Sequence, residues 1–108
     1  MNVGPQGAFR ALGDPTRRSI LMLLSSQDMS IREVASQFEV TRGAIQKHLS
    51  VLEQGELISV RTVGRERINH LELSAIKAVS EWLGYFDQYW DKRLTSLKQA
   101  IENEKEEK

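Results

Sequence analysis

The sequence predicts a mainly α-helical protein with one small β-hairpin, on three observations. Residues 30–54 contain two amphipathic helical patterns separated by a very short turn, residues 57–71 are rich in β-branched side chains around a glycine, and residues 73–104 repeat apolar side chains every three or four positions. Spacings of three and four are typical of a helix, whereas alternation and β-branching are typical of a strand. Two helices joined by a short turn and followed by a hairpin form a winged helix-turn-helix, which is the fold class we expect.

The composition is that of one globular domain covering residues 1–108. Hydrophobic residues make up 40% and charged residues 28% of the chain, which is ordinary for such a domain. The chain has no cysteine, which excludes disulfides and cysteine–zinc sites. It shows neither a signal peptide nor an apolar run long enough to span a membrane. We therefore expect a cytoplasmic protein with no membrane partner.

Charge is distributed unevenly along a chain whose formal net charge is zero. Zero net charge argues mildly against nucleic-acid binding, because DNA-binding domains usually carry a basic patch. Residues 1–71 nevertheless hold nine basic and seven acidic residues, whereas residues 72–108 hold six and eight. The basic excess therefore lies in the compact part of the expected fold.

Two helices are expected before the helix-turn-helix. Residues 1–13 form a short N-terminal helix that contains Phe9, and Asp14 then caps a second helix that starts at Pro15. Aspartate is favoured at the N-cap and proline at the first helical position. The winged helix-turn-helix core is expected to cover residues 14–72.

The helix-turn-helix consists of a helix near residues 30–38 and a recognition helix at residues 41–54. Ser30 and Glu33 have the S-x-x-E spacing of a capping box, and Thr41 is placed to cap the recognition helix. The buried face of the recognition helix is marked by apolar residues at helical spacing, Ile45, Leu49 and Leu52.

The opposite face of residues 41–54 is small, polar and basic, which suits entry into the major groove of DNA, about 12 Å wide. Arg42 and Lys47 can donate to guanine or to phosphate, Gln46 can pair with adenine, and Gly43 leaves room for a base edge. A solvated helix surface is the alternative explanation. The DNA-binding residues predicted on this helix are Thr41, Arg42, Gly43, Gln46, Lys47 and Ser50.

Residues 57–71 are expected to form the hairpin, or wing. Gly64 marks its turn, and Arg65 and Arg67 are predicted to contact the DNA backbone or the minor groove. Phosphate contacts of this kind position a protein on DNA, whereas contacts to base edges provide specificity. The alternative is a solvated turn in which Glu66 offsets part of the charge.

Residues 73–104 are expected to form one long helix that joins two copies of the chain, followed by a frayed tail at 105–108. About 30 residues span about 45 Å, which exceeds the expected width of the preceding body, and an apolar stripe exposed over that length is a liability. Gly84 marks a close contact or a bend. The alternative to a two-fold dimer is a helix that folds back onto its own core. The interface residues predicted are Phe9, Trp82, Phe86, Tyr89, Trp90, Leu94 and Leu97.

The sequence contains no pattern that indicates catalysis or a metal site. His48 falls at the edge of the packed face and is expected to be structural, and His70 has no second ligand at metal-binding spacing. Asp87 and Asp91 lie one helical turn apart without a histidine or cysteine nearby. No nucleophile–base pair or phosphate-binding loop can be assembled. We expect no enzymatic activity, no metal and no cofactor.

Several stretches resemble the ArsR/SmtB family of winged-helix repressors: FRALGDPTRRSILMLL, IREVASQFEVTRGAIQKHLSVLEQGELI and VGRERINHLEL. The stretch EWLGYFDQYWDKRLTSLKQAIE is similar to the last helix of a branch that does not sense metals, and REVAS stands where the metal sensors carry cysteines. The chain departs from the family pattern at Asn69, where an aromatic residue is common, and at Glu56, where glycine is usual and Gly55 comes one position early. The resemblance implies a homodimeric repressor that occupies a palindromic operator in double-stranded DNA.

Two other functions stay open from the residues. The same surface, or the aromatic stripe, can bind protein partners in place of DNA, and apolar space beside the last helix can accept an unidentified small-molecule effector. A titration over salt separates a DNA regulator from a protein-binding module, because DNA binding weakens with salt as counterions are released.

Overall fold

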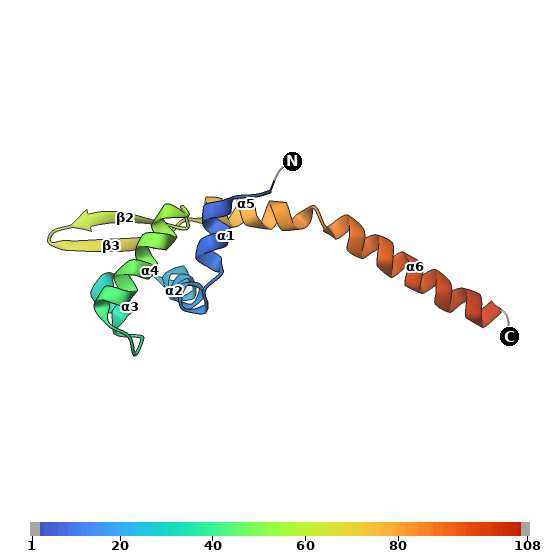
Figure 1. Ribbon diagram of the computed structural model, residues 1–108, viewed down its shortest axis with the longest axis horizontal. Coiled ribbons are helices and arrows are strands. Elements are labelled where there is room, and N and C mark those ends of the chain that lie inside the picture. The colour runs from blue at the N-terminus through green and yellow to red at the C-terminus, as the bar shows by residue number, and fades with distance from the viewer. Residues whose placement is uncertain (1–2, 107–108) are drawn as a thin grey trace.

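A computed structural model of the chain describes residues 3–106 and consists of a small body with a long helical arm (Figure 1). The body contains a short sheet with helices packed on it, and the arm continues the last helix of the body. The elements in chain order are α1 (Gln6–Leu12), α2 (Pro15–Ser26), β1 (Met29–Ser30), α3 (Ile31–Ala35), α4 (Arg42–Gln54), β2 (Ile58–Val63), β3 (Glu66–Leu71), α5 (Leu73–Gly84) and α6 (Asp87–Glu106).

The predicted helix starts are confirmed by their cap hydrogen bonds. The side chain of Asp14 accepts from the backbone N–H groups of Thr16 at 2.8 Å and Arg17 at 3.1 Å. The bond from Arg17 is the main cause that lowers the pKa of Asp14 below its ordinary value. Ser30 and Glu33 form the expected capping box at α3. These bonds satisfy N–H groups that a helix start otherwise leaves unpaired.

The recognition helix α4 ends at Gln54 in a glycine-type cap whose left-handed position is occupied by Glu56, with φ +60°. The N–H groups of Glu56 and Leu57 donate to the carbonyls of Glu53 and Leu52, both at 3.0 Å, which is the Schellman pattern. Gly55 is needed for another reason, because a Cβ atom there would lie 2.6 Å from the backbone oxygen of Gly7 in α1. This close approach explains why glycine stands one position earlier than the family pattern.

Replacing Glu56 with glycine is expected to stabilise the fold by about 0.5–1 kcal/mol, because a side chain in the left-handed region costs roughly 1 kcal/mol or more. The measurement is the free energy of unfolding from denaturant titration. Glu53→Gly, one turn earlier in α4, is the control and is expected to destabilise. A Glu56→Gly variant no more stable than the parent contradicts the strain assigned to this cap.

The sheet has the order β1-β3-β2 and is antiparallel throughout. The hairpin between β2 and β3 is confirmed, with Val63 opposite Glu66 and Gly64 in the turn at φ +62°. Strand β1 was not expected, because its two residues are too few to give an alternating pattern. The buried side chain of Asn69 donates from Nδ2 to the Met29 carbonyl at 3.1 Å. The amide at position 69 therefore fastens the wing to β1.

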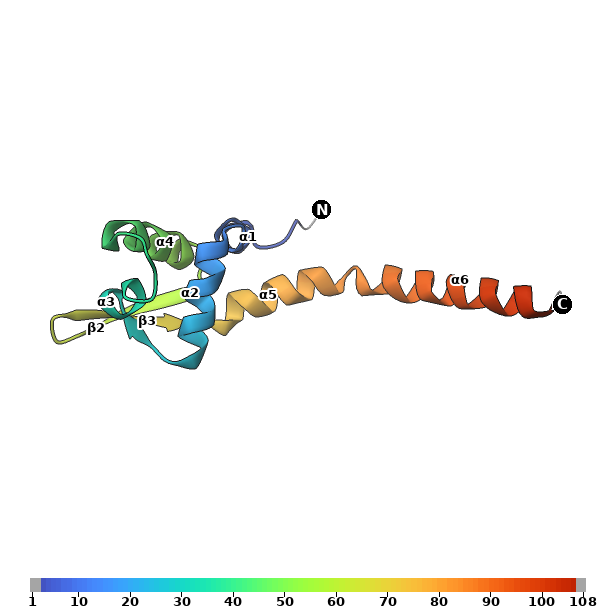
Figure 2. The same cartoon turned by 90° about the horizontal axis from the view of Figure 1, so that it is seen from below.

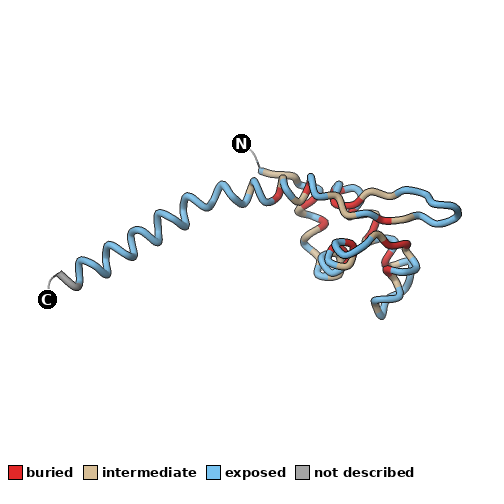
Figure 3. The backbone as a smooth tube through the Cα atoms, turned by 180° about the vertical axis from the view of Figure 1, so that it is seen from behind, coloured by how far each residue is buried: buried red, intermediate tan, exposed pale blue. Residues whose placement is uncertain are grey.

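The core lies between the helices of the body and one face of the sheet. Figure 3 shows that the buried residues lie in the body, whereas the residues along the arm are exposed. The predicted inner face of α4 is confirmed, because Ile45 and Leu52 are fully buried and Leu49 is 3% exposed. The core also includes residues of the other body elements, among them Ala11, Ile20, Val34 and Leu57.

The prediction of one uninterrupted helix at residues 73–104 is wrong. The segment divides at Gly84–Phe86 into the two helices α5 and α6. The N–H groups of Tyr85 and Phe86 donate to the carbonyls three residues before them, of Trp82 and Leu83, which is a tight turn in place of regular α-helix. Glycine has a low helix propensity, and Gly84 is the last residue of α5. Figure 2 shows that the two helices continue in nearly one direction. The tail predicted at 105–108 begins inside α6, and its last two residues lie outside the described part of the chain.

Candidate DNA-binding surface

The outer face of α4 is exposed to solvent, as the recognition-helix prediction requires. Arg42, Gly43, Gln46 and Lys47 are exposed, and Thr41 caps the helix by accepting from the Ala44 N–H at 3.1 Å. A Cβ atom at position 43 would approach nothing closer than the Thr41 hydroxyl at 3.9 Å. Packing within the chain therefore does not require this glycine, and the first turn of α4 is open to a ligand.

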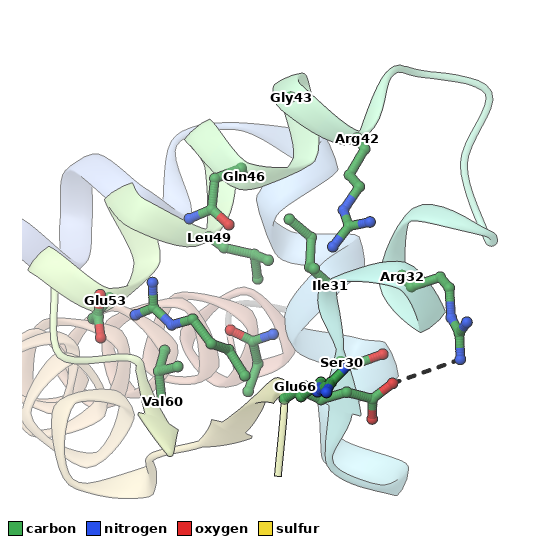
Figure 4. Close-up of a pocket in the computed structure, with 13 residues that line it drawn as sticks. Ser30, Ile31, Arg32, Arg42, Gly43, Gln46, Leu49, Glu53, Val60 and Glu66 are labelled. Carbon is green, nitrogen blue, oxygen red and sulfur yellow. Dashed lines mark ion pairs between the residues drawn. The ribbon is translucent and has the colours of Figure 1, made fainter. Parts of the chain in front are cut away.

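A concavity of about 510 Å³ lies between α4, the start of α3 and the wing (Figure 4). Arg42 and Gln46 point into it from α4. The predicted residues that line it are Arg42, Gly43, Gln46, Arg65 and Arg67. The remaining predicted DNA contacts, Thr41, Lys47 and Ser50, do not line it. At 100° per residue, Lys47 and Ser50 lie on the neighbouring side of α4, about 80–140° around the helix from Arg42. Ser50 is half-buried and accepts a hydrogen bond from Gln46 Nε2 at 3.2 Å.

Arg32 is a basic residue of this surface that the sequence analysis missed. It lines the concavity from α3, and its Nη2 atom lies 3.6 Å from Glu66 Oε1 in the wing. Both side chains are more than half exposed, so this ion pair contributes little to stability. The Arg32 guanidinium therefore lies at the edge of the concavity, largely exposed to solvent. No local pattern in the sequence places α3 beside the wing, because the pairing of β1 with β3 brings them together.

Arg17 fixes α4 relative to α1 and α2. Its Nε atom donates to the Ala11 carbonyl at 2.8 Å, one Nη atom donates to the Arg10 carbonyl at 3.0 Å, and the other lies 3.3 Å from Nδ1 of His48 in α4. His48 is half-buried, in agreement with the structural role predicted for it. The arginine therefore ties the end of α1 to the middle of the recognition helix.

Asp28 anchors the wing to the body and was also missed. Its carboxylate lies 2.7 Å from His70 Nδ1 in β3 and 2.9 Å from an Arg61 Nη atom in β2. The hydrogen bond from His70, followed by that from Arg61, lowers the pKa of Asp28 below its ordinary value of 3.8. His70, which lacks a metal-binding companion in the sequence, thus has a structural partner 42 residues away.

Replacing Asp28 with asparagine is expected to lower the melting temperature at neutral pH, because the charged partner of the wing is lost. A carboxyl group whose pKa is lowered by folding stabilises the fold above its unfolded pKa and loses that contribution as pH falls through its folded pKa. The difference in melting temperature between Asp28→Asn and the parent should therefore narrow below about pH 4. Glu39→Gln, in an exposed turn, is the control, and a difference that persists unchanged at low pH contradicts this role of the charge.

The predicted interface residues form one cluster and one stripe. Phe9 contacts Trp82 edge-to-face with ring centroids 5.2 Å apart, and Trp82 contacts Phe86 in the same way at 5.1 Å. The ring centroid of Tyr89 lies 6.2 Å from that of Phe86. The other three, Trp90, Leu94 and Leu97, follow along α6 and are all more than half exposed. The structure therefore joins α1, α5 and the first turn of α6 through aromatic rings, and leaves the rest of the arm uncovered.

Residues 3–106 contain neither a metal-binding cluster nor a membrane-spanning helix. Among these residues no group of three or more His, Asp or Glu side chains is arranged to hold a metal ion. None of the helices in this range is both long and apolar enough to cross a membrane.

The chain is similar in sequence and in structure to bacterial transcriptional regulators. The family model described as bacterial regulatory protein, ArsR family, matches residues 14–60. The chain is 33% identical over 100 residues to the HTH-type transcriptional regulator Rv2034 of Mycobacterium tuberculosis, covering 93% of this chain and 91% of that protein. It is 35% identical over 75 residues to the transcriptional repressor SdpR of Bacillus subtilis, covering 69% and 83%. An ArsR-like transcriptional regulator from Rhodococcus sp. RHA1 superposes with a TM-score of 0.71 at 34% identity, covering 87% and 89%.

Proposed function

Because the chain belongs to the ArsR family of bacterial regulatory proteins and is a winged helix-turn-helix transcriptional regulator, we propose that it acts as a homodimeric repressor. In this proposal the two α4 helices enter successive major grooves of a palindromic operator, and the wings lie on the backbone or in the minor groove. A bacterial regulator of this kind binds chromosomal DNA, which lies in the cytoplasm, so we propose a cytoplasmic location.

The observation that carries this proposal is the convergence of Arg32, Arg42, Arg65 and Arg67 on one concavity beside Gln46. Arginine suits phosphate oxygens and guanine edges, and glutamine suits adenine edges. The same concavity is lined by two carboxylates, Glu53 and Glu66, so the four arginines leave it with a net positive charge. This local excess favours DNA although the whole chain has no net charge, because electrostatic attraction to DNA depends on the local patch.

The homodimer is proposed from the aromatic cluster and the exposed stripe of α6. Soluble monomers rarely expose apolar patches of this extent, and a second copy offers an equal surface related by a two-fold axis. A two-fold dimer also presents two recognition helices to DNA at once, which strengthens binding beyond what one short helix provides. The small-molecule effector stays a prediction, since the hollows beside the α5–α6 junction belong to this same apolar surface.

The test is a titration of the protein against DNA from the region upstream of its own gene, at several salt concentrations. If three or four arginines of each subunit neutralise phosphates, the logarithm of affinity should fall with the logarithm of salt with a slope of about −5 to −7. The Arg65→Gln, Arg67→Gln variant should reduce that slope by about 4, because it removes two contacts from each subunit. Absence of binding at low salt overturns the proposal and favours a protein-binding module.

A further inference from the structure

Asn69 has a hydrogen-bond acceptor that the proposed DNA contacts do not use. Its side chain is 3% exposed, and its Nδ2 atom donates to the Met29 carbonyl at 3.1 Å. Its Oδ1 atom accepts no hydrogen bond from any residue between positions 3 and 106. Over the same range every fully buried side-chain oxygen or nitrogen has a partner, so this oxygen must be open to the concavity that Asn69 lines. The concavity therefore contains an unpaired acceptor on a side chain that packing holds in place.

The concavity extends below the exposed face of α4. Leu49, on the buried face of that helix, is 3% exposed and lines the concavity, and Figure 4 shows Leu49 above Val60 of β2. Val60 is paired with Asn69 in the sheet, and directly paired residues have their side chains on the same face. A DNA duplex contacts exposed side chains, so it does not reach Leu49 or Asn69. The inner part of the concavity thus combines apolar side chains with the amide oxygen of Asn69.

The outer part of the concavity is basic. Four arginines and two glutamates line it, which leaves an excess of two positive charges. Arg42 points into it from α4, beside Gln46. Guanidinium groups bind carboxylate and phosphate groups through paired hydrogen bonds. The volume of about 510 Å³ lies within the range of about 300–1,000 Å³ that is usual for sites of small organic molecules.

We propose that the concavity binds a small organic anion and that this ligand competes with DNA. The inference rests on the proposed function, because it assigns a regulator to the same surface. The carboxylate or phosphate group of the ligand pairs with arginines at the rim, and its apolar body packs against Leu49 and Val60. A hydroxyl or N–H group of the ligand donates to Asn69 Oδ1. An arginine that holds the ligand is not available to a DNA phosphate, so occupation of the concavity weakens operator binding.

The probe is 4-hydroxybenzoate, which carries a carboxylate and a hydroxyl group at opposite ends of an apolar ring. We expect it to raise the melting temperature and, at about ten times its dissociation constant, to weaken operator binding about 10-fold or more. Acetate at the same concentration controls for ionic strength, and 4-hydroxyphenyl phosphate tests whether a phosphate is preferred to a carboxylate. If neither aromatic probe raises the melting temperature more than acetate does, the ligand site is refuted.

Benzoate tests the contact with Asn69, because it lacks the hydroxyl group that donates to Oδ1. We expect it to bind about 3- to 10-fold more weakly than 4-hydroxybenzoate, which is the usual effect of one hydrogen bond. Titration calorimetry measures both affinities. Equal affinities overturn the role assigned to the amide oxygen.

Filling the concavity provides the matched test on the protein. Val60→Phe places a larger ring inside it and keeps the hydrogen bond from Asn69 to Met29, so the response to 4-hydroxybenzoate should be lost while operator binding is kept. Val63→Phe, at the exposed end of the same strand and outside the concavity, is the control and should keep the response. Asn69→Phe fills the same space from β3 and replaces Val60→Phe if that variant does not fold. A folded variant that fills the concavity and still responds overturns the proposal.

The two measurements separate this inference from the proposed function. Absence of operator binding without any probe refutes the proposed function, whereas the melting temperature still decides whether the ligand site exists. A probe that binds the protein and leaves operator affinity unchanged refutes the competition with DNA and leaves the proposed function intact.

Discussion

Replacing Leu94 with aspartate is expected to convert the dimer into monomers and to weaken operator binding by about 100-fold or more. Leu94 is 62% exposed in the single chain, so the substitution disturbs no core. In the dimer it places an unpaired carboxylate in an apolar contact, which is costly. A monomer also loses the gain from binding two half-sites at once, which is commonly 100-fold or more. Light scattering measures the mass, and titration of operator DNA measures the affinity.

The matched control for this prediction is Gln99→Asp on the same helix. At 100° per residue, position 99 lies on the side of α6 opposite to the stripe, so its carboxylate stays in water. We expect this variant to keep both the dimer mass and the affinity. An unchanged mass for Leu94→Asp would show that the stripe does not hold the dimer together.

The features of the fold that were predicted correctly depend on residues close together in the chain. Asp14, Ser30 and Thr41 each accept from backbone N–H groups two or three residues later, so the sequence contains both partners of each cap. The inner face of α4 is likewise set by a repeat of three and four residues. The exposed face of α4 follows from the same repeat, which is why the recognition helix could be located.

The features that were missed depend on contacts between distant parts of the chain. β1 pairs with residues about 40 positions away, and Asp28 meets His70 across 42 positions. Arg32 enters the concavity only because that pairing brings α3 to the wing. The last helix is an intermediate case. The bend that is one of the two alternatives at Gly84 is present, because α5 ends at this residue, whereas the length of the break depends on the hydrogen bonds of Tyr85 and Phe86, which no spacing rule reveals.

Replacing Gln46 and Lys47 together with alanine is expected to weaken operator binding by about 10- to 100-fold and to relax its sequence preference. A side chain that pairs with a base edge contributes about 1–3 kcal/mol of discrimination, and each subunit supplies one copy of this pair of residues. Both side chains are exposed, so the dimer mass and the melting temperature should not change. The measurement compares affinity for the operator with affinity for an unrelated duplex, at one salt concentration.

The outcome distinguishes base reading from simple attraction to the backbone. Loss of two phosphate contacts weakens binding to both duplexes equally, whereas loss of a base contact lowers the ratio between them. Gln27→Ala, at the exposed end of α2, is the control and should leave both affinities unchanged. If the double variant binds the operator as the parent does, then α4 does not lie in the major groove, and the wing or another surface must read the sequence.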